Sequence, residues 1–153
     1  MYGTFLMQPA QTQLAFQTVI PLYQKAVLRG KLHGLLATLT RRSSRLQKLS
    51  DLLNGKTITT QRPAGVRVVR ISDIRASEER ADDFDRTFNP LETHTKSRWL
   101  SIAAARLSGV PMPAVELLKV GDVYAVRDGH HRISVAQALG EHFIDANVVL
   151  CDL

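Results

Sequence analysis

The sequence predicts an α+β fold, in which a basic helical arm precedes a small mixed-sheet domain. Up to residue 53 leucines recur at helical spacing, whereas after Gly65 β-branched segments alternate with apolar helical ones. The charge changes at the same place. Residues 1–62 hold nine Lys or Arg against one acidic residue, whereas residues 63–153 hold 11 basic and 13 acidic residues. We therefore divide the chain into an arm, 1–62, and a domain, 63–153.

Length and composition exclude several classes of protein. At 153 residues, with 44% hydrophobic and 22% charged residues, the chain has the composition of a globular protein rather than of a disordered, collagen-like or disulfide-stapled one. Cys151 has no second thiol to pair with. No apolar run is long enough to span a membrane, and the N-terminal segment does not follow the signal-peptide pattern. We expect a cytoplasmic protein, with association to the nucleoid as an alternative.

The arm shows helical periodicity in two stretches. Residues 12–28 have helical recurrence, but Pro21 predicts a broken helix or two short ones. From Lys31 onward, leucines at steps of three, four and seven predict one helix that ends at Asn54-Gly55. These leucines are Leu32, Leu35, Leu36, Leu39, Leu46, Leu49 and Leu53.

The basic residues of the arm are candidates for nucleic-acid contacts, since Lys and Arg side chains bind phosphates. Packing against the domain or a second copy, contact with an acidic membrane, and a merely solvated face are the alternatives. We expect DNA or RNA to bind through residues 25–62, and a homodimer is compatible with the leucines. The four side chains that we select are Arg41, Arg42, Arg45 and Lys48.

The domain reads as strand, helix, strand, strand, helix and strand. Gly109, Gly121 and Gly140 mark ends or turns between these elements. The predicted ranges are 66–71, 96–107, 115–120, 122–127, 133–139 and 144–150. Three aromatic side chains are predicted to lie in the core, namely Phe84, Phe88 and Trp99.

One short segment contains most of the candidate site residues. It is Asp128-Gly129-His130-His131-Arg132, and it lies between a predicted strand and a predicted helix. Glycine allows a sharp turn, and the free amide groups of a helix start favour an anion. Cations at that end of a helix make sense if they surround a phosphate. The alternative is that Asp128 caps the helix and that His130, His131 and Arg132 occupy its first turn without binding a ligand. A metal site has less support, because adjacent histidines point apart.

Residues 71–149 resemble the ParB N-terminal and sulfiredoxin superfamily. The resemblance is carried by Ile71-Ser72-Asp73-Ile74, by Gly109 to Pro113, by Tyr124 to Arg132 and by Ala136 to Gly140. It implies a nucleotide-binding domain for ATP, ADP or CTP with Mg²⁺. It further implies that the turn binds the phosphates, through Gly129, His130, His131 and Arg132, with Asp128 as a Mg²⁺ ligand.

The branches of this superfamily differ in chemistry. His130 stands where sulfiredoxins have their cysteine, and the chain ends soon after the last predicted strand, so neither sulfinyl repair nor a complete partition protein is expected. The turn looks most like the serine-kinase branch, which implies a catalytic set of Asp128, His131 and Glu79. We expect a nucleotide-binding domain that couples to nucleic acid or a partner through the arm. A small phosphotransferase, a nuclease, or an interaction domain without nucleotide are the alternatives, and whether the protein is an enzyme stays open.

Overall fold

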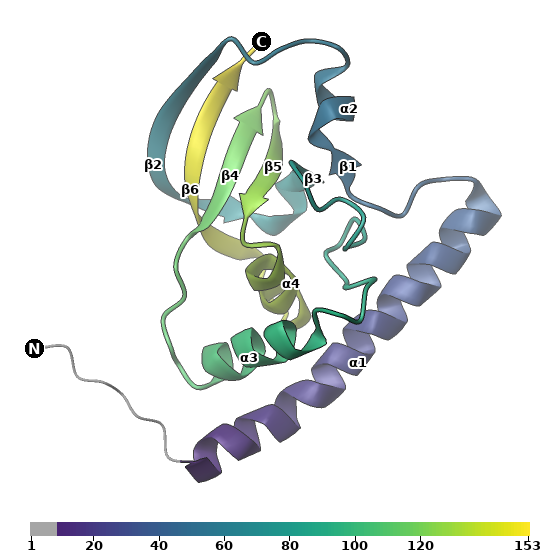
Figure 1. The fold of residues 1–153 in the computed structure, drawn as a ribbon, viewed down its shortest axis with the longest axis vertical. Coiled ribbons are helices and arrows are strands. Elements are labelled where there is room, and N and C mark those ends of the chain that lie inside the picture. The colour runs from purple at the N-terminus through teal and green to yellow at the C-terminus, as the bar shows by residue number, and fades with distance from the viewer. Residues whose placement is uncertain (1–8) are drawn as a thin grey trace, which may run out of the picture.

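The structure is a computed structural model that describes residues 9–153. A long N-terminal helix is followed by a mixed six-stranded sheet, against which two further helices pack (Figure 1). This arrangement confirms the predicted α+β class. The helices are α1 Pro9–Thr40, α2 Leu49–Leu53, α3 Lys96–Leu107 and α4 His130–Ala138. No helix within the described residues is long and apolar enough to cross a membrane.

The sheet has the order β1-β3-β5-β4-β6-β2. Antiparallel pairs join β4 to β5 and β2 to β6, whereas the other three pairs are parallel. A 3-10 turn, Ile71–Asp73, separates β2 from β3. The strands are β1 Gln47–Lys48, β2 Thr60–Arg70, β3 Ile74–Ser77, β4 Val115–Val120, β5 Val123–Asp128 and β6 Phe143–Asp152.

Helix α1 runs through Pro21 without a break, so the predicted interruption is wrong. Proline fits helical φ and removes only one hydrogen bond. On either side of it, Val19 and Tyr23 are buried against Trp99 and Leu100 of α3. This packing outweighs the lost hydrogen bond. Val19, Tyr23, Ala26 and Gly30 form one buried face along the helix.

The predicted single helix over the leucines is also wrong, because α1 ends at Thr40 and Arg41 takes a left-handed φ of 54°. The chain then becomes extended. Leu46 is buried in the main core, and Leu49 begins the short α2, which ends at Asn54 with a left-handed φ of 47°. The leucine periodicity thus spans two helices and an extended segment. From Leu28 onward the leucines of α1 are half-exposed or more, namely Leu28, Leu32, Leu35, Leu36 and Leu39.

The domain elements agree with the prediction in type and order, apart from the short strand β3, which the sequence reading missed. Strand β2 begins at Thr60 rather than Val66, β6 extends past both of its predicted ends, and α4 begins at His130 rather than Ile133. The boundary drawn at residues 62 and 63 falls inside β2. Segments assigned to the arm therefore supply β1, α2 and the start of β2.

Three apolar clusters hold these elements together. Phe84 and Phe88 lie in the main cluster beneath α4, as predicted. Trp99 is fully buried between α1 and α4, where its ring meets Tyr23 edge-on and its Nε1 donates to Ser134 Oγ at 2.9 Å. Trp99 therefore connects the three helices.

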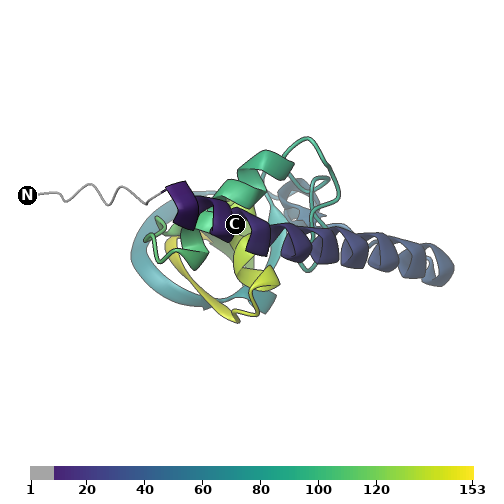
Figure 2. The ribbon, with the colours of Figure 1, turned by 90° about the horizontal axis from the view of Figure 1, so that it is seen from below.

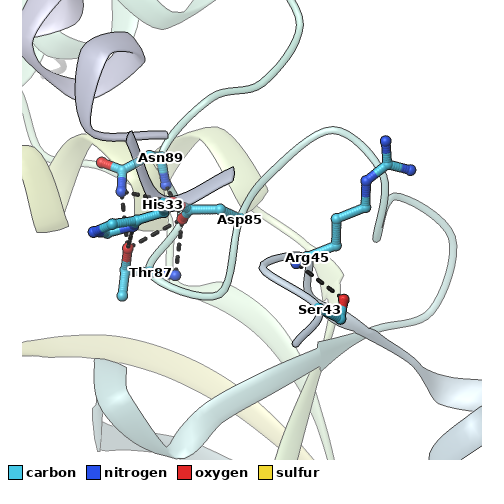
Figure 3. Close-up of polar contacts among 6 residues, drawn as sticks. All are labelled: His33, Ser43, Arg45, Asp85, Thr87 and Asn89. Atoms are coloured by element: carbon cyan, nitrogen blue, oxygen red, sulfur yellow. Dashed lines mark hydrogen bonds and ion pairs between the residues drawn. The ribbon is translucent and has the colours of Figure 1, made fainter. Parts of the chain in front are cut away.

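Helix α1 is fixed near its middle by a buried carboxylate. Asp85 is 1% exposed, and its Oδ2 accepts from His33 Nδ1 at 2.8 Å and from Asn89 Nδ2 at 2.9 Å (Figure 3). Its Oδ1 accepts from the backbone amides of Thr87 and Asn89 and from the Thr87 hydroxyl. A Cβ at Gly30 would lie 3.3 Å from atoms of the 89–91 loop. Past this anchor, α1 extends beyond α3 and α4 (Figure 2).

Candidate anion-binding site

The segment from Asp128 to Arg132 forms the predicted turn between β5 and α4. Gly129 precedes the helix with a φ of 107°, and a Cβ there would lie 2.5 Å from Val115 Cγ1. Both the backbone conformation and the space therefore require glycine. The first intrahelical bond runs from Ile133 N to Gly129 O. The amide groups of residues 130–132 therefore lack partners within α4 and can bind an anion.

These residues line a hollow of about 180 Å³, which we call the anion hollow. The structure gathers there all the site residues that the sequence reading named for catalysis and cofactor binding. Four arginines also surround it, three of them unforeseen. The lining consists of Glu79, Arg80, Arg98, Ile102, Arg127, Asp128, Gly129, His130, His131 and Arg132.

The two histidines are buried and electrically neutral at pH 7. Each is 4% exposed, and burial lowers the pKa of each to about 4. The positive charge of Arg80 lowers both values further, and Arg98 does so for His131. The positive charge of the anion hollow therefore comes from its arginines and its helix start, and not from its histidines.

His130 and His131 differ in their hydrogen bonds. His130 Nε2 lies 2.7 Å from the hydroxyl of Ser77 at the end of β3, which also accepts from the Arg80 amide. The ring of Phe84 packs against both imidazoles, with ring centroids 5.9 Å and 5.4 Å apart. His131 Nε2 is buried and has no hydrogen-bond partner within residues 9–153. A water molecule or an ion in the hollow can supply one.

Arg132 connects α4 to the segment before β4. Its Nη1 donates to the carbonyls of Pro113 and Ala114 at 2.7 and 3.0 Å, and its Nη2 donates to Asp128 Oδ2 at 3.0 Å. Its side chain is 16% exposed, whereas that of Asp128 is 67% exposed. Arg132 thus supports the turn as well as lining the hollow.

The carboxylates of the site lie at its rim. Glu79 is exposed in the bend after β3, where the structure has no helix, and it lines the hollow together with Asp128. Its neighbour Glu78 pairs instead with Arg127 at 3.1 Å. Within residues 9–153, no three His, Cys, Asp or Glu side chains gather as a metal site would require.

The sequence reading missed Ser77, Arg80, Arg98 and Arg127. Arg98 is exposed and has no ion pair among the described residues, whereas Arg80 pairs with Asp83 at 2.9 Å. Ser77 and Arg80 follow a strand that was not predicted, so their proximity to the turn had no signal in the sequence. Arg98 precedes the buried Trp99 on α3. Its position beside a predicted core tryptophan was the one sequence feature that could have indicated Arg98.

The four basic residues chosen in the arm do not form one surface helix. Arg45 and Lys48 both approach Asp82, with nitrogen to oxygen distances of 3.0 and 3.9 Å. The backbone amide of Arg45 also donates to the hydroxyl oxygen of Ser43 (Figure 3). Arg41 and Arg42 are exposed, without an ion pair in the described part of the chain.

A second hollow, of about 160 Å³, adjoins the anion hollow, since Ile102 and Arg132 line both. Its other walls are largely apolar, and its charged groups, Arg106 and Asp145, lie among them. The remaining lining residues are Val68, Met112, Phe143 and Ile144.

Comparison of the sequence with known protein families found no match, and comparison with curated proteins found none either. Among solved structures, the fold is similar to that of sulfiredoxin from Arabidopsis thaliana. The two share 16% sequence identity with a TM-score of 0.41, over 54% of this chain and 82% of the sulfiredoxin chain. The likeness to the sulfiredoxin and ParB fold is thus coarse.

Proposed function

We propose that the protein binds the phosphate groups of a nucleotide in the anion hollow. The observation that carries this proposal is the buried Nε2 of His131, which has no partner among the described residues although it belongs to a residue that lines the hollow. Buried polar atoms are almost always hydrogen-bonded, so this nitrogen requires a partner from outside residues 9–153, such as a water molecule or an ion. A phosphate oxygen or hydroxyl would supply the missing bond.

The charge of the hollow favours the same ligand. Arg98 is free of ion pairs among the described residues, and the start of α4 adds three unbonded amides. Neutral histidines add hydrogen bonds without further repulsion between cations. About 180 Å³ admits phosphate groups but not a whole nucleotide, and the adjoining hollow has walls of both apolar and charged side chains for its remaining part.

Mg²⁺ fits this arrangement as a companion of the phosphates. It usually binds one or two carboxylates and completes its shell with phosphate oxygens and water. Asp128 and Glu79 are the carboxylates that line the hollow, and Asp128 is already paired on one oxygen with Arg132. When bound, the ion would neutralise phosphate charge.

Coupling to nucleic acid through the arm remains part of the proposal. Arg41 and Arg42 are its best candidates, because Arg45 and Lys48 are partly neutralised by Asp82. Helix α1 packs against α3, which carries Arg98 into the anion hollow. Nucleotide binding could therefore alter how firmly the arm is held.

A second candidate function is phosphoryl transfer, which the exposed Glu79 at the rim favours. A carboxylate beside bound phosphates could accept a proton from water as the water oxygen bonds to the terminal phosphorus, while the nucleotide with one phosphate fewer leaves and the arginines stabilise the charge of the transferred group. Glu79→Gln should then abolish release of labelled phosphate but leave nucleotide affinity unchanged. Equal turnover by this variant and the natural chain would exclude the role of Glu79.

Thermal unfolding with pyrophosphate, ATP, ADP and CTP, each with and without Mg²⁺, tests the binding proposal. A ligand at about a hundred times its Kd adds about 2.7 kcal/mol of stability, which raises the Tm by several degrees. Arg98→Gln should remove this rise without lowering the basal Tm, because the side chain is exposed and unpaired. Arg29→Gln on α1, also exposed, is the control. The proposal fails if no ligand stabilises the natural chain, or if both variants respond alike.

A further inference from the structure

We propose that a second surface binds single-stranded nucleic acid. It consists of Arg70 at the end of β2, Arg75 on β3, Arg86 in the loop before α3, and Phe143 at the start of β6; we call it the arginine surface. It lies outside the anion hollow and differs from the basic residues selected in the arm. The proposal therefore stands apart from nucleotide binding.

The charges of the arginine surface are free to act on a ligand. Six arginines of the described chain form ion pairs with acidic side chains, whereas Arg70, Arg75 and Arg86 are exposed and form none within residues 9–153. Their guanidinium groups also make no hydrogen bond in that part of the chain. Phosphate groups would replace water there without first breaking an ion pair.

The three arginines surround two neighbouring hollows. Arg70 and Arg86 line one of about 370 Å³, and Arg75 and Arg86 line another of about 290 Å³. Because Arg86 belongs to both, the two hollows adjoin. No acidic residue among those described lines either of them. Asp73, which lies between Arg70 and Arg75 in the sequence, is half-buried and is absent from both linings.

Phe143 supplies an aromatic face beside these charges. Its side chain is 53% exposed, and it stands directly opposite Arg70 across the β2 and β6 pair. The Arg70 guanidinium lies 5.9 Å from the centre of the ring. An exposed ring next to a guanidinium is a stacking platform for a base, and base stacking with nearby cations is how proteins bind single strands. In a duplex the bases are paired and stacked inside the helix, so they cannot stack on the ring. An acidic peptide would bind the arginines without needing the ring.

The surface is also suited to a long ligand. Phe143 lines the first of the two hollows and, in addition, the hollow that adjoins the anion hollow. Val68 and Arg70 are two residues apart on β2, so both point to the same side of the sheet as their partners Asp145 and Phe143. The three hollows therefore adjoin one another in turn, which suits a strand of several nucleotides.

The test is fluorescence anisotropy with labelled DNA and RNA strands of about 12 nucleotides, a length within the usual range of single-strand sites. The full-length protein is compared with the R70Q/R75Q/R86Q variant. The control is R67Q/K119Q, which removes two charges of the domain that line neither these two hollows nor the anion hollow. Thermal unfolding checks each fold, since the three arginines form no ion pair in the described residues and only Arg70 loses a contact, the one with the Phe143 ring.

We expect both strands to bind, and the R70Q/R75Q/R86Q variant to bind at least about tenfold more weakly. Its slope of log affinity against log salt should fall by about 2, since each phosphate contact of a single strand contributes about 0.7. Phe143→Ala should weaken binding without changing that slope, because stacking releases no counterions. Arg98→Gln, which tests the anion hollow, should leave strand binding intact.

Four outcomes would overturn the proposal. The first is that neither the DNA nor the RNA strand binds at about 50 mM salt. The second is an equal loss of affinity in the R67Q/K119Q control. The third is that a duplex of the same length binds as tightly and does not respond to Phe143→Ala, which would exclude stacking. The fourth is equal competition by polyglutamate, which would assign the surface to an acidic protein.

Discussion

At the scale of single residues, the two adjacent histidines have different tasks. His130 is held by Ser77 and Phe84 in the first turn of α4, whereas His131 has a buried ring nitrogen without a partner among the described residues. Both depend on burial within a ring of arginines. The same burial that makes them neutral also makes the fold sensitive to acid.

We predict that the free energy of unfolding falls as the pH is lowered from about 6.5 toward about 4. In the unfolded chain a histidine has its ordinary pKa of 6.5, whereas burial lowers the pKa of His130 and His131 in the folded chain to about 4. Between these values the unfolded chain takes up protons that the folded chain does not. The contribution is complete above pH 6.5, and by about pH 5 roughly 2 kcal/mol per histidine is lost.

Urea unfolding at several values between pH 7 and pH 5 measures this dependence. His131→Gln should reduce it by about half, because glutamine does not titrate and His130 keeps its share. The other four of the five histidines are present in both proteins. The difference in pH dependence between the two proteins therefore comes from His131. Identical pH dependence in the two proteins would contradict the prediction.

Local sequence patterns predicted only the residues of the turn, and Glu79 was named from the family resemblance. The turn from Asp128 to Arg132 was found because glycine before a helix start and cations at its first turn form a local pattern. Ser77, Arg80 and Arg98 reach the turn from β3 and α3, 30 or more residues away. Their contribution depends on strand pairing and helix packing, which no short pattern contains.

At the scale of elements, tertiary packing determines where α1 ends, which the leucine periodicity did not predict. The leucines after Lys31 fit one helix by spacing, yet the chain leaves α1 at Arg41 so that Leu46 can enter the core and β1 can pair with β3. Pro21 is accommodated in α1 for a related reason, since burial on both sides holds the helix together. The sequence predicted both ends of α3, but not the ends of α1 or the start of α4.

The docking of α1 depends on the contact between Asp85 and His33. We predict that substitutions of these two residues lower the free energy of unfolding by unequal amounts. Asp85→Ala should cost about 3 kcal/mol or more, because the buried donors of Thr87 and Asn89 would lose their acceptor. His33→Ala removes one hydrogen bond at a partly exposed site and should cost about 1 kcal/mol. Chemical denaturation measures both values.

Hydrogen exchange locates the effect of His33→Ala. Amides near the C-terminal end of α1 should exchange faster, whereas those around Val19 and Tyr23 should not change, since the α3 contact holds them. Faster exchange along the whole of α1 would show that the helix is released as one unit and would contradict this division.

At the scale of the whole molecule, the arm and the domain are physically continuous. The charge step that suggested two parts is real in the sequence, but segments from both sides build one sheet. Thr60 to Arg62 pair with the end of β6, Leu46 lies in the main cluster, and Val19 covers Trp99. Much of the fold's apolar burial therefore crosses the charge boundary.

We predict that a fragment of residues 63–153 will not fold cooperatively, although it contains the whole turn of the anion hollow. It lacks β1, the start of β2, and the helix that covers α3, so Trp99 and the edge of β6 would face water. Differential scanning calorimetry should show a sharp transition for the full chain and a broad one, or none, for the fragment. A fragment of residues 41–153 retains the sheet and should recover its stability when a peptide of residues 9–40 is added, because that peptide restores the cover over Trp99. A sharp transition in the 63–153 fragment would contradict this view and would make the arm a separate part of the protein.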